Sequence, residues 1–178
     1  SLSEANLKIV DTGSTDTDPK YFSTIGASSG KWYAEFKATA FSSNSHAIGI
    51  FATQGDFNDS ASDGLCRISY AASSPSIYAF GSTVESSLGT TSAGDILAIL
   101  VDIDNGTVQF YKNGSTYGNQ VTGLTSNFSN RTIHFCMFGE AGSGRTFTTE
   151  ANFGSPPYSI SSGNSDANGY GNFEYSVP

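Results

Sequence analysis

The chain has 178 residues, of which 37% are hydrophobic and 13% are charged, and its eight basic and sixteen acidic residues give a net charge of −8. This length fits one domain with a sizeable apolar core. The basic residues are scattered, so the sequence offers no cationic track for nucleic-acid phosphates, and no apolar run approaches the roughly 18 residues that cross a bilayer. We therefore expect a single acidic domain over residues 1–178, with neither nucleic acid nor membrane insertion among its interactions.

The first strong strand pattern lies at residues 30–41, GKWYAEFKATAF. Apolar and polar residues alternate there: Trp32, Ala34, Phe36 and Ala38 fall on one side, and Lys31, Tyr33, Glu35 and Lys37 on the other. A period of two is typical of a strand that has one face in the core and one in solvent. The pattern therefore predicts that the only tryptophan lies in the core and that Glu35 faces solvent.

Strand patterns continue along the rest of the chain. They cover residues 46–53, 66–72, 76–82, 95–103, 107–112, 132–140 and 145–154. Gly49 predicts close packing of the first of these strands, and the segment 95–103, apolar on both faces, is typical of a central strand. Small polar residues predict loops at 11–18 and 161–172. Because turn signals recur every 8 to 12 residues or so and no helical period is sustained, we predict an all-β fold, a two-layer antiparallel β-sandwich.

Two Asn-Gly pairs punctuate the segment GDILAILVDIDNGTVQFYKNG, residues 94–114. Asn-Gly favours a type I′ hairpin turn, so we predict one at Asn105-Gly106, with Asp104 opposite Thr107, and a second turn at Asn113-Gly114. The acidic oxygens near the first pair could instead bind calcium. Calcium needs six or more oxygens, however, which a tight turn does not supply, and we favour the hairpin.

The two cysteines, Cys66 and Cys136, both lie in apolar strand patterns. Free cysteine behaves as a small hydrophobic residue, and we expect two buried thiols rather than a disulfide. The chain starts without Met or a signal-like leader, and we expect it to be a piece of a longer protein.

Four segments occur in the order and spacing of a SPRY (B30.2-like) domain. They are SSGKWYAEFKAT, AIGIF, GDILAILVDIDNGTVQFYKNGSTYG and GRTFTTEANFG, which ends in the Asn-Phe-Gly triplet of residues 152–154. The chain resembles this family over residues 28–158. The resemblance implies two curved antiparallel sheets, related to the concanavalin-like jelly rolls, whose loops bind a partner. The low charge and the Ser/Thr/Asn/Gly-rich tail make it similar to the SPRY-type domains of tailed-phage virion proteins. The family's sheet usually closes with a strand after this tail, where the present chain stops.

The loop at residues 53–64, TQGDFNDSASDG, is the first candidate ligand site. It contains an aromatic ring among acidic and amide groups: Asp56, Phe57, Asn58, Asp59 and Asp63. The spacing begins like an EF-hand loop, but Ala61 stands where the turn needs glycine and no glutamate closes the loop. We therefore predict no metal, although an irregular calcium site remains an alternative.

The polar tail is the second candidate site, through Asn168, Tyr170, Asn172 and Phe173. Sugar recognition combines an aromatic face, which stacks on the pyranose ring, with amides and carboxylates that bond its hydroxyls, and both candidate sites offer these groups. The alternative is that Tyr170 and Phe173 only pack the tail onto the sandwich.

No catalytic constellation is evident. A glycosidase needs two neighbouring carboxylates, whereas the glutamates stand alone on their segments, although carboxylates distant in sequence could still converge in space. Neither histidine lies in a recognisable nucleophile context. These residues are Glu35, Glu140, Glu150, Glu174, His46 and His134. We predict a protein that is not an enzyme, with no catalytic residues and no cofactor, in which both histidines are structural.

These observations lead to a functional hypothesis with one main alternative. The chain is expected to be a binding domain displayed on a virion surface, recognising a host-surface glycan or receptor through its loops. The alternative is a structural virion module, a head-decoration or fibre-connecting domain, that contacts neighbouring virion proteins. A homo-oligomer is left open, and an adaptor for a cellular peptide fits the composition less well.

Overall fold

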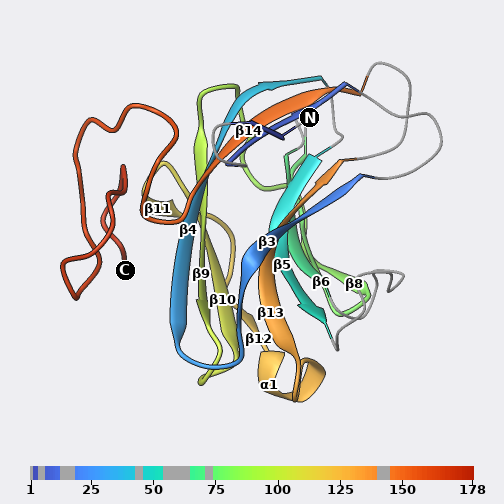
Figure 1. The fold of residues 1–178 in the computed structure, drawn as a ribbon. Coiled ribbons are helices and arrows are strands. Elements are labelled where there is room, and N and C mark those ends of the chain that lie inside the picture. The colour runs from blue at the N-terminus through green and yellow to red at the C-terminus, as the bar shows by residue number, and fades with distance from the viewer. Residues whose placement is uncertain are drawn as a thin grey trace.

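The computed structural model describes residues 2–3, 7–12, 19–42, 46–53, 65–70, 74–139 and 145–178. These residues form two antiparallel sheets packed face to face (Figure 1), which confirms the predicted all-β sandwich. One four-residue helix, α1 (Leu124–Asn127), follows β12. In the described part of the chain, no helix has the length and apolar character needed to cross a membrane.

The larger sheet, called sheet A here, has eight strands in the order β1-β2-β14-β4-β9-β10-β11, with β12 also paired to β10. Their bounds are β1 Leu2–Ser3, β2 Lys8–Asp11, β4 Lys31–Phe41, β9 Ile96–Asp102, β10 Thr107–Lys112, β11 Ser115–Thr116, β12 Val121–Thr122 and β14 Phe147–Asn152. The predicted central strand, β9, does lie between two partners, β4 and β10. At one edge of this sheet, β2 pairs with β14 and β1 pairs with β2.

The smaller sheet, sheet B, has six strands in the order β3-β13-β5-β6-β7-β8. Their bounds are β3 Lys20–Ala27, β5 His46–Thr53, β6 Leu65–Tyr70, β7 Ile77–Ala79, β8 Ser82–Glu85 and β13 Thr132–Gly139. The sequence analysis predicted neither β2 nor β3. Strand β3 lacks the regular alternation of buried and exposed residues because its pairing with β13 is irregular.

The core fills the space between the sheets. Its largest fully buried side chains come from both sheets and from α1: Phe36, Phe110, Phe147, Ile48, Ile50, Ile68, Ile77, Leu97, Ile99 and Leu124. Phe51 is equally buried but packs in a second cluster with Ala47, Cys136 and Phe138. Trp32 does not join them, because 41% of it is exposed, and the prediction of a core tryptophan is wrong. It stands one residue from the start of β4, and its Nε1 donates a hydrogen bond to the Ser29 carbonyl of the preceding turn at 2.8 Å. The alternation of β4 predicts on which face of the sheet a side chain lies. It does not predict how far along the strand the opposite sheet covers that face.

The two Asn-Gly pairs form different turns. Asp102 pairs with Thr107, so the first loop holds the four residues 103–106, and the predicted two-residue type I′ turn there is wrong. In this loop Gly106 has φ 67°, whereas Asn105 does not adopt a positive φ. The Asn113-Gly114 pair has φ 49° and 79° and joins Lys112 directly to its partner Ser115, as a type I′ turn requires.

Acidic side chains explain why the first loop is longer. The Asp102 carboxylate accepts hydrogen bonds from Asn105 N and Nδ2 at 2.9 and 2.8 Å, and it lies 3.3 Å from the Lys31 ammonium. Asp104 accepts a bond from Gly30 N at 3.0 Å. The bonds from Asn105, ahead of the ion pair with Lys31, lower the pKa of Asp102. These carboxylates therefore join the β9–β10 loop to the β3–β4 turn. The described residues contain no cluster of acidic, histidine or cysteine side chains suited to a metal.

Both cysteines are free and buried, as predicted. Burial raises the pKa of the Cys66 thiol to about 12, so it stays protonated. Both histidines form hydrogen bonds with backbone carbonyls: His46 Nε2 lies 2.9 Å from Thr146 O, and His134 Nδ1 lies 2.9 Å from Ser23 O. These contacts agree with the prediction that the histidines are structural.

The substitution Gly49→Ala is expected to destabilise the sandwich. A Cβ at this position would lie 2.2 Å from the Cys66 carbonyl oxygen and 2.8 Å from Arg67 Cα, and these backbone atoms cannot rotate away. We expect the free energy of unfolding, measured by urea denaturation, to fall by about 1–3 kcal/mol. Gly89→Ala is the matched control, because its Cβ would meet nothing within 4 Å and should change the value by less than about 0.5 kcal/mol. Equal effects of the two substitutions would contradict the close packing.

Candidate functional site

A buried carboxylate on the outer face of sheet A organises the C-terminal part of the chain. Glu35, in the middle of β4, has no exposed surface, so the prediction that it faces solvent is wrong. The carboxylate accepts five hydrogen bonds: at Oε1 from Tyr175 N (2.9 Å) and Tyr33 Oη (3.3 Å), and at Oε2 from Glu174 N (3.0 Å), Asn152 Nδ2 (3.1 Å) and Tyr158 Oη (3.3 Å). An ionised carboxylate, which only accepts hydrogen bonds, matches this set of donors.

Asn152 connects this carboxylate to the end of β14. It lies directly opposite Glu35 in the sheet and is itself fully buried. Besides its bond to Glu35, its Nδ2 donates to Asn172 O at 2.9 Å, while its Oδ1 accepts from Gly154 N at 2.8 Å. Gly154 has φ 105°, in the region that favours glycine, and here the chain leaves the sheet. The Asn-Phe-Gly triplet therefore begins the tail.

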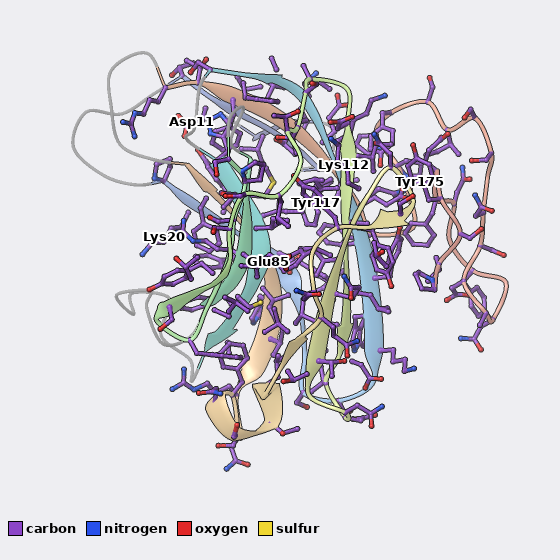
Figure 2. All side chains as sticks on the ribbon, turned by 180° about the vertical axis from the view of Figure 1, so that it is seen from behind. Asp11, Lys20, Glu85, Lys112, Tyr117 and Tyr175 are labelled. Atoms are coloured by element: carbon purple, nitrogen blue, oxygen red, sulfur yellow. The ribbon has the colours of Figure 1, made fainter. Side chains whose placement is uncertain are left out.

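The tail, residues 153–178, is called the C-terminal lobe here and stands outside sheet A (Figure 1). Phe173 is 5% exposed and packs edge-on against the Tyr33 ring, with centroids 5.2 Å apart. The Lys37 ammonium lies 5.1 Å from the centroid of the Tyr158 ring. Tyr175, labelled in Figure 2, packs on the β10–β11 turn, where a Cβ on Gly114 would come within 2.6 Å of its ring. Aromatic rings and backbone amides thus cover the face that the alternation of β4 assigned to solvent.

The electrostatic environment keeps the Tyr33 hydroxyl protonated, which is the form that can donate a hydrogen bond to Glu35. Burial raises the pKa of the Tyr33 phenol, and the neighbouring charge of Glu35 raises it further. The phenol therefore remains protonated near neutral pH and donates its hydrogen to Glu35.

The tip of the lobe is a tight turn built around Asp166. Its Oδ1 accepts hydrogen bonds from Asn168 N at 2.9 Å and from Tyr170 N at 2.8 Å. The backbone adds bonds from Asp166 N to Tyr170 O (2.8 Å) and from Gly169 N to Asp166 O (3.0 Å). At the base of the tip, Asn164 and Phe173 form an antiparallel bridge. The Tyr170 side chain, 73% exposed, is consequently presented on a turn whose backbone is bonded internally.

The structure separates the predicted tail residues into two groups. Asn168, Tyr170 and Asn172 have exposed side chains, whereas Phe173 is buried and anchors the lobe. The alternative in which both aromatics pack the tail thus describes Phe173 but not Tyr170. The other candidates, Asp56, Phe57, Asn58, Asp59 and Asp63, lie outside the described residues.

Sequence reasoning did not find the residues that hold the lobe, Glu35, Asn152 and Tyr158. One signal was present: Glu35 is the only acidic residue in the long strand pattern of residues 30–41. Apart from Tyr33, its partners are 117 to 140 residues away in the chain, and no local pattern indicates them.

Comparisons with known proteins support the fold. Similar solved structures are the SPRY domain of human HERC1 (TM-score 0.60, 15% identity, 80% of this chain and 92% of that one) and the PSpry domain of TRIM65 (TM-score 0.62, 16% identity, 85% and 84%). Stonustoxin is also similar (TM-score 0.59, 19% identity), over 85% of this chain and 24% of that one. No protein-family model matches the chain, and no curated protein does. The described sandwich therefore has the fold of SPRY domains, which confirms the predicted fold class.

The substitution Glu35→Gln is expected to loosen the lobe. A glutamine amide would turn an NH2 group toward donors that now face a carboxylate oxygen, leaving buried N–H or O–H groups without acceptors. We expect the free energy of unfolding to fall by about 1–3 kcal/mol, and hydrogen exchange at the Glu174 and Tyr175 amides to accelerate. Glu85→Gln is the control, because the carboxylate of Glu85 accepts a bond from Asn119 N outside the lobe. Unchanged exchange at both lobe amides would contradict the role of Glu35.

The lobe is also expected to respond to acid through Glu174. Hydrogen bonds from the Ser161 hydroxyl and backbone N–H lower the pKa of Glu174 below its ordinary value of 4.5. A carboxylate whose pKa is lower in the folded state stabilises that state above its unfolded pKa, and this contribution is lost as the pH falls through the folded pKa. We expect the NMR shift of the Ser161 amide to titrate with a midpoint below 4.5.

Two comparisons test this assignment. The Glu174→Gln variant should lose the transition, and the chain unfolded in urea should show the ordinary glutamate pKa. A midpoint at or above 4.5 in the folded protein would show that the bonds from Ser161 do not favour the ionised form.

Proposed function

We propose that this domain binds a carbohydrate through the tip of the C-terminal lobe, with Tyr170 as the stacking surface and Asn168 as a hydrogen-bonding group. The observation that carries the proposal is the presentation of Tyr170, which is 73% exposed on a turn bonded to Asp166. A turn whose backbone is already ordered before binding loses little conformational entropy when its side chain meets a ligand. The amide of Asn168 can donate to and accept from sugar hydroxyls.

The proposal is of a binding domain that is not an enzyme. Two acids come together at the lobe, but both are engaged structurally: Glu35 is buried under five donors, and Glu174 accepts bonds from Ser161. Neither has a free oxygen directed at an open cleft, as a general acid or nucleophile on a glycosidic bond requires.

The finer proposal is that the domain is displayed on a virion and that the carbohydrate belongs to a host surface. The support is compositional: few charges, a Ser/Thr/Asn/Gly-rich tail and an acidic balance, as in the phage proteins that the sequence resembles. A structural virion module that contacts neighbouring virion proteins is the outcome that a failed carbohydrate test would favour.

A glycan array tests the proposal with the substitution Tyr170→Ala. We expect the purified domain to bind bacterial surface glycans, and the variant to bind at least about tenfold more weakly because it loses the stacking surface. Tyr170→Phe keeps the ring and should retain most of the affinity. Val84→Ala, at an exposed apolar residue of β8 in sheet B, is the control and should bind normally.

The array is run with calcium and again with a chelator. No binding in either condition at high protein concentration would contradict the proposal. Loss of binding only with the chelator would bring the carboxylates of residues 53–64 into the site.

A further inference from the structure

Arg131, the residue before β13, has a buried N–H group that meets no acceptor. Its Nη1 is buried, and no hydrogen-bond partner lies within reach of it in the described part of the chain. The ion pairs found among the described residues involve Lys8, Lys31 and Lys112 instead. Native proteins pair nearly all buried polar atoms, so an unpaired N–H group of this kind indicates where an external acceptor binds.

The backbone turns Arg131 toward the space between the sheets. Ile133 and Phe135, which follow it on β13, face the core. Because side chains alternate along a strand, Arg131 lies on the same side as these two residues. Its backbone N–H donates to Phe128 O at 3.2 Å, which fixes the turn between α1 and β13. The guanidinium is therefore placed at the end of the sandwich, beside α1.

Arg131 lines a pocket of about 260 Å³, called the Arg131 pocket here. The pocket lies where α1 and the turn after it meet the β3–β4 turn and the β9–β10 loop. Among the described residues that line it, Arg131 is the only charged one. The exposed residues Ser28 and Ser129 add hydroxyl groups, and the apolar part of the wall is formed by Ile103, Leu124, Phe128 and Ile133. Pockets for drug-sized ligands span roughly 300–1,000 Å³, so this one suits a small ligand.

The chemistry of Arg131 selects an anion as the acceptor. A water molecule can accept the bond from Nη1, but it does not balance the positive charge of the guanidinium. A carboxylate does both, because its two oxygens match the planar fork of N–H groups. The acids of the β9–β10 loop do not fill this role, since Asp102 and Asp104 accept bonds from Asn105 and from Gly30 N.

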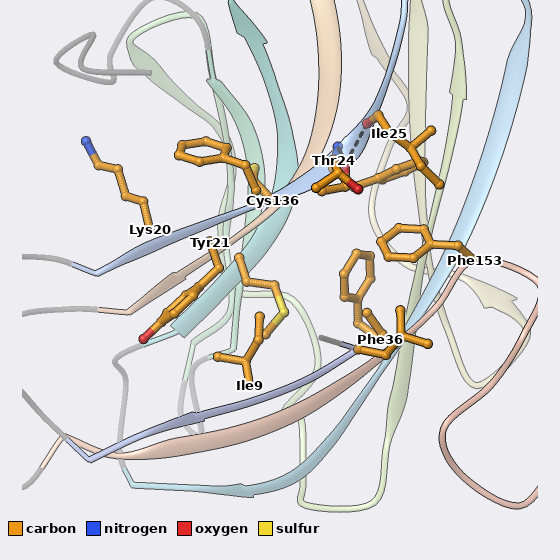
Figure 3. A pocket seen from close by; sticks show the side chains of 14 residues that line it. Ile9, Lys20, Tyr21, Thr24, Ile25, Phe36, Cys136 and Phe153 are labelled. Carbon is orange, nitrogen blue, oxygen red and sulfur yellow. Dashed lines mark hydrogen bonds between the residues drawn. The ribbon is translucent and has the colours of Figure 1, made fainter. Parts of the chain in front are cut away.

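An apolar surface continues from the Arg131 pocket to Trp32. Ile103 and Ile133 also line a shallow hollow beside the pocket, together with Ile25 and Trp32. Ile25, on β3 (Figure 3), and Trp32 are 48% and 41% exposed. Large apolar side chains that are exposed side by side commonly mark a binding surface. A cation next to such a surface complements a ligand with an anionic head and an apolar body.

The larger cavity between the sheets gives no comparable signal. It measures about 430 Å³, and Ile9, Phe36 and Phe153 form part of its wall (Figure 3). Among the described residues that line it, none has a buried polar side-chain atom without a partner. Its chemistry therefore selects no particular ligand.

We propose that the Arg131 pocket binds a small organic carboxylate. The carboxylate accepts hydrogen bonds from the guanidinium, and the apolar body of the ligand lies along Ile103 and Ile133 toward Trp32. Charge-assisted hydrogen bonds provide selectivity for the anion, and burial of the apolar body adds affinity. The proposal does not depend on carbohydrate binding, because none of these residues belongs to the C-terminal lobe.

Titration with 4-phenylbutanoate, which joins a carboxylate to an aromatic ring, tests the proposal. Trp32 is the only tryptophan, so its fluorescence reports a ligand beside it. We expect saturable binding of one molecule per chain, with a change in this fluorescence and in the NMR shift of the Arg131 Nε–H. The uncharged 4-phenylbutanamide should bind at least about tenfold more weakly because it loses the charge-assisted bonds. Butanoate, which has no ring, should also bind at least about tenfold more weakly.

Three results of these titrations would overturn the proposal. The first is the absence of saturable binding, which would leave water as the acceptor for Nη1. The second is equal affinity for the carboxylate and its amide. The third is tighter binding of inorganic phosphate than of 4-phenylbutanoate, which would show that the pocket selects a different anion.

The substitution Arg131→Gln locates the bound carboxylate. We expect the variant to bind 4-phenylbutanoate at least about tenfold more weakly and to lose the preference for the carboxylate over the amide. Arg67→Gln is the matched control, because the Arg67 guanidinium lies 5.3 Å from the centroid of the Tyr78 ring and does not line the Arg131 pocket. It should bind normally.

Circular dichroism checks that both variants fold. Folded Arg131→Gln that retains the affinity and the preference for the carboxylate would overturn the assignment, because the ligand would then bind elsewhere. If Arg131→Gln does not fold, the comparison of carboxylate and amide on the unsubstituted protein decides, together with the shift of the Arg131 Nε–H.

Discussion

The position of the C-terminal lobe depends on the burial of one carboxylate. Removing an ionised group from water is costly unless its oxygens receive hydrogen bonds in exchange. Glu35 receives five, and its two shortest, from Glu174 and Tyr175, are backbone N–H groups of the lobe. The same contacts therefore satisfy the acid and bring the end of the chain back to the middle of β4. Without this acceptor, the two amides would lose their partner, and contacts such as those of Asn152 with Asn172 and of Phe173 with Tyr33 would have to hold the segment on that face of the sheet.

Three consecutive residues at the end of β14 contact different parts of the molecule. Asn152 points to the outer face, where it bonds to Glu35 and to the lobe, and Gly154 provides the turn that leaves the sheet. Phe153, between them, packs against Phe36 and Phe135 in the core. Successive side chains at the end of a strand point to opposite faces, so one short segment contributes both to the lobe and to the core between the sheets.

Local patterns predicted the regular strands well and the irregular ones poorly. The alternation of β4 and the apolar run of β9 gave nearly correct bounds because each side chain's face follows from its place in the strand. Strand β3 was missed because its bulge breaks the period of two. The turn at Asn105 was mispredicted because Asn105 donates a hydrogen bond to the Asp102 side chain. The Asn-Gly pair alone does not indicate this contact. In the tail, Tyr170 and Phe173 could be found from composition, but the roles of Glu35 and Asn152 in holding the lobe could not.

The sequence by itself determined the regular strands, the class of fold and the second Asn-Gly turn, since these depend on residues that are neighbours in the chain. Only the tertiary structure decided that Glu35 is buried and that Trp32 is exposed. Burial depends on what lies across from a side chain, and the amides that cover Glu35 come from 139 and 140 residues further along. A strand's alternation specifies two faces, but the rest of the folded chain decides which parts of each face meet water.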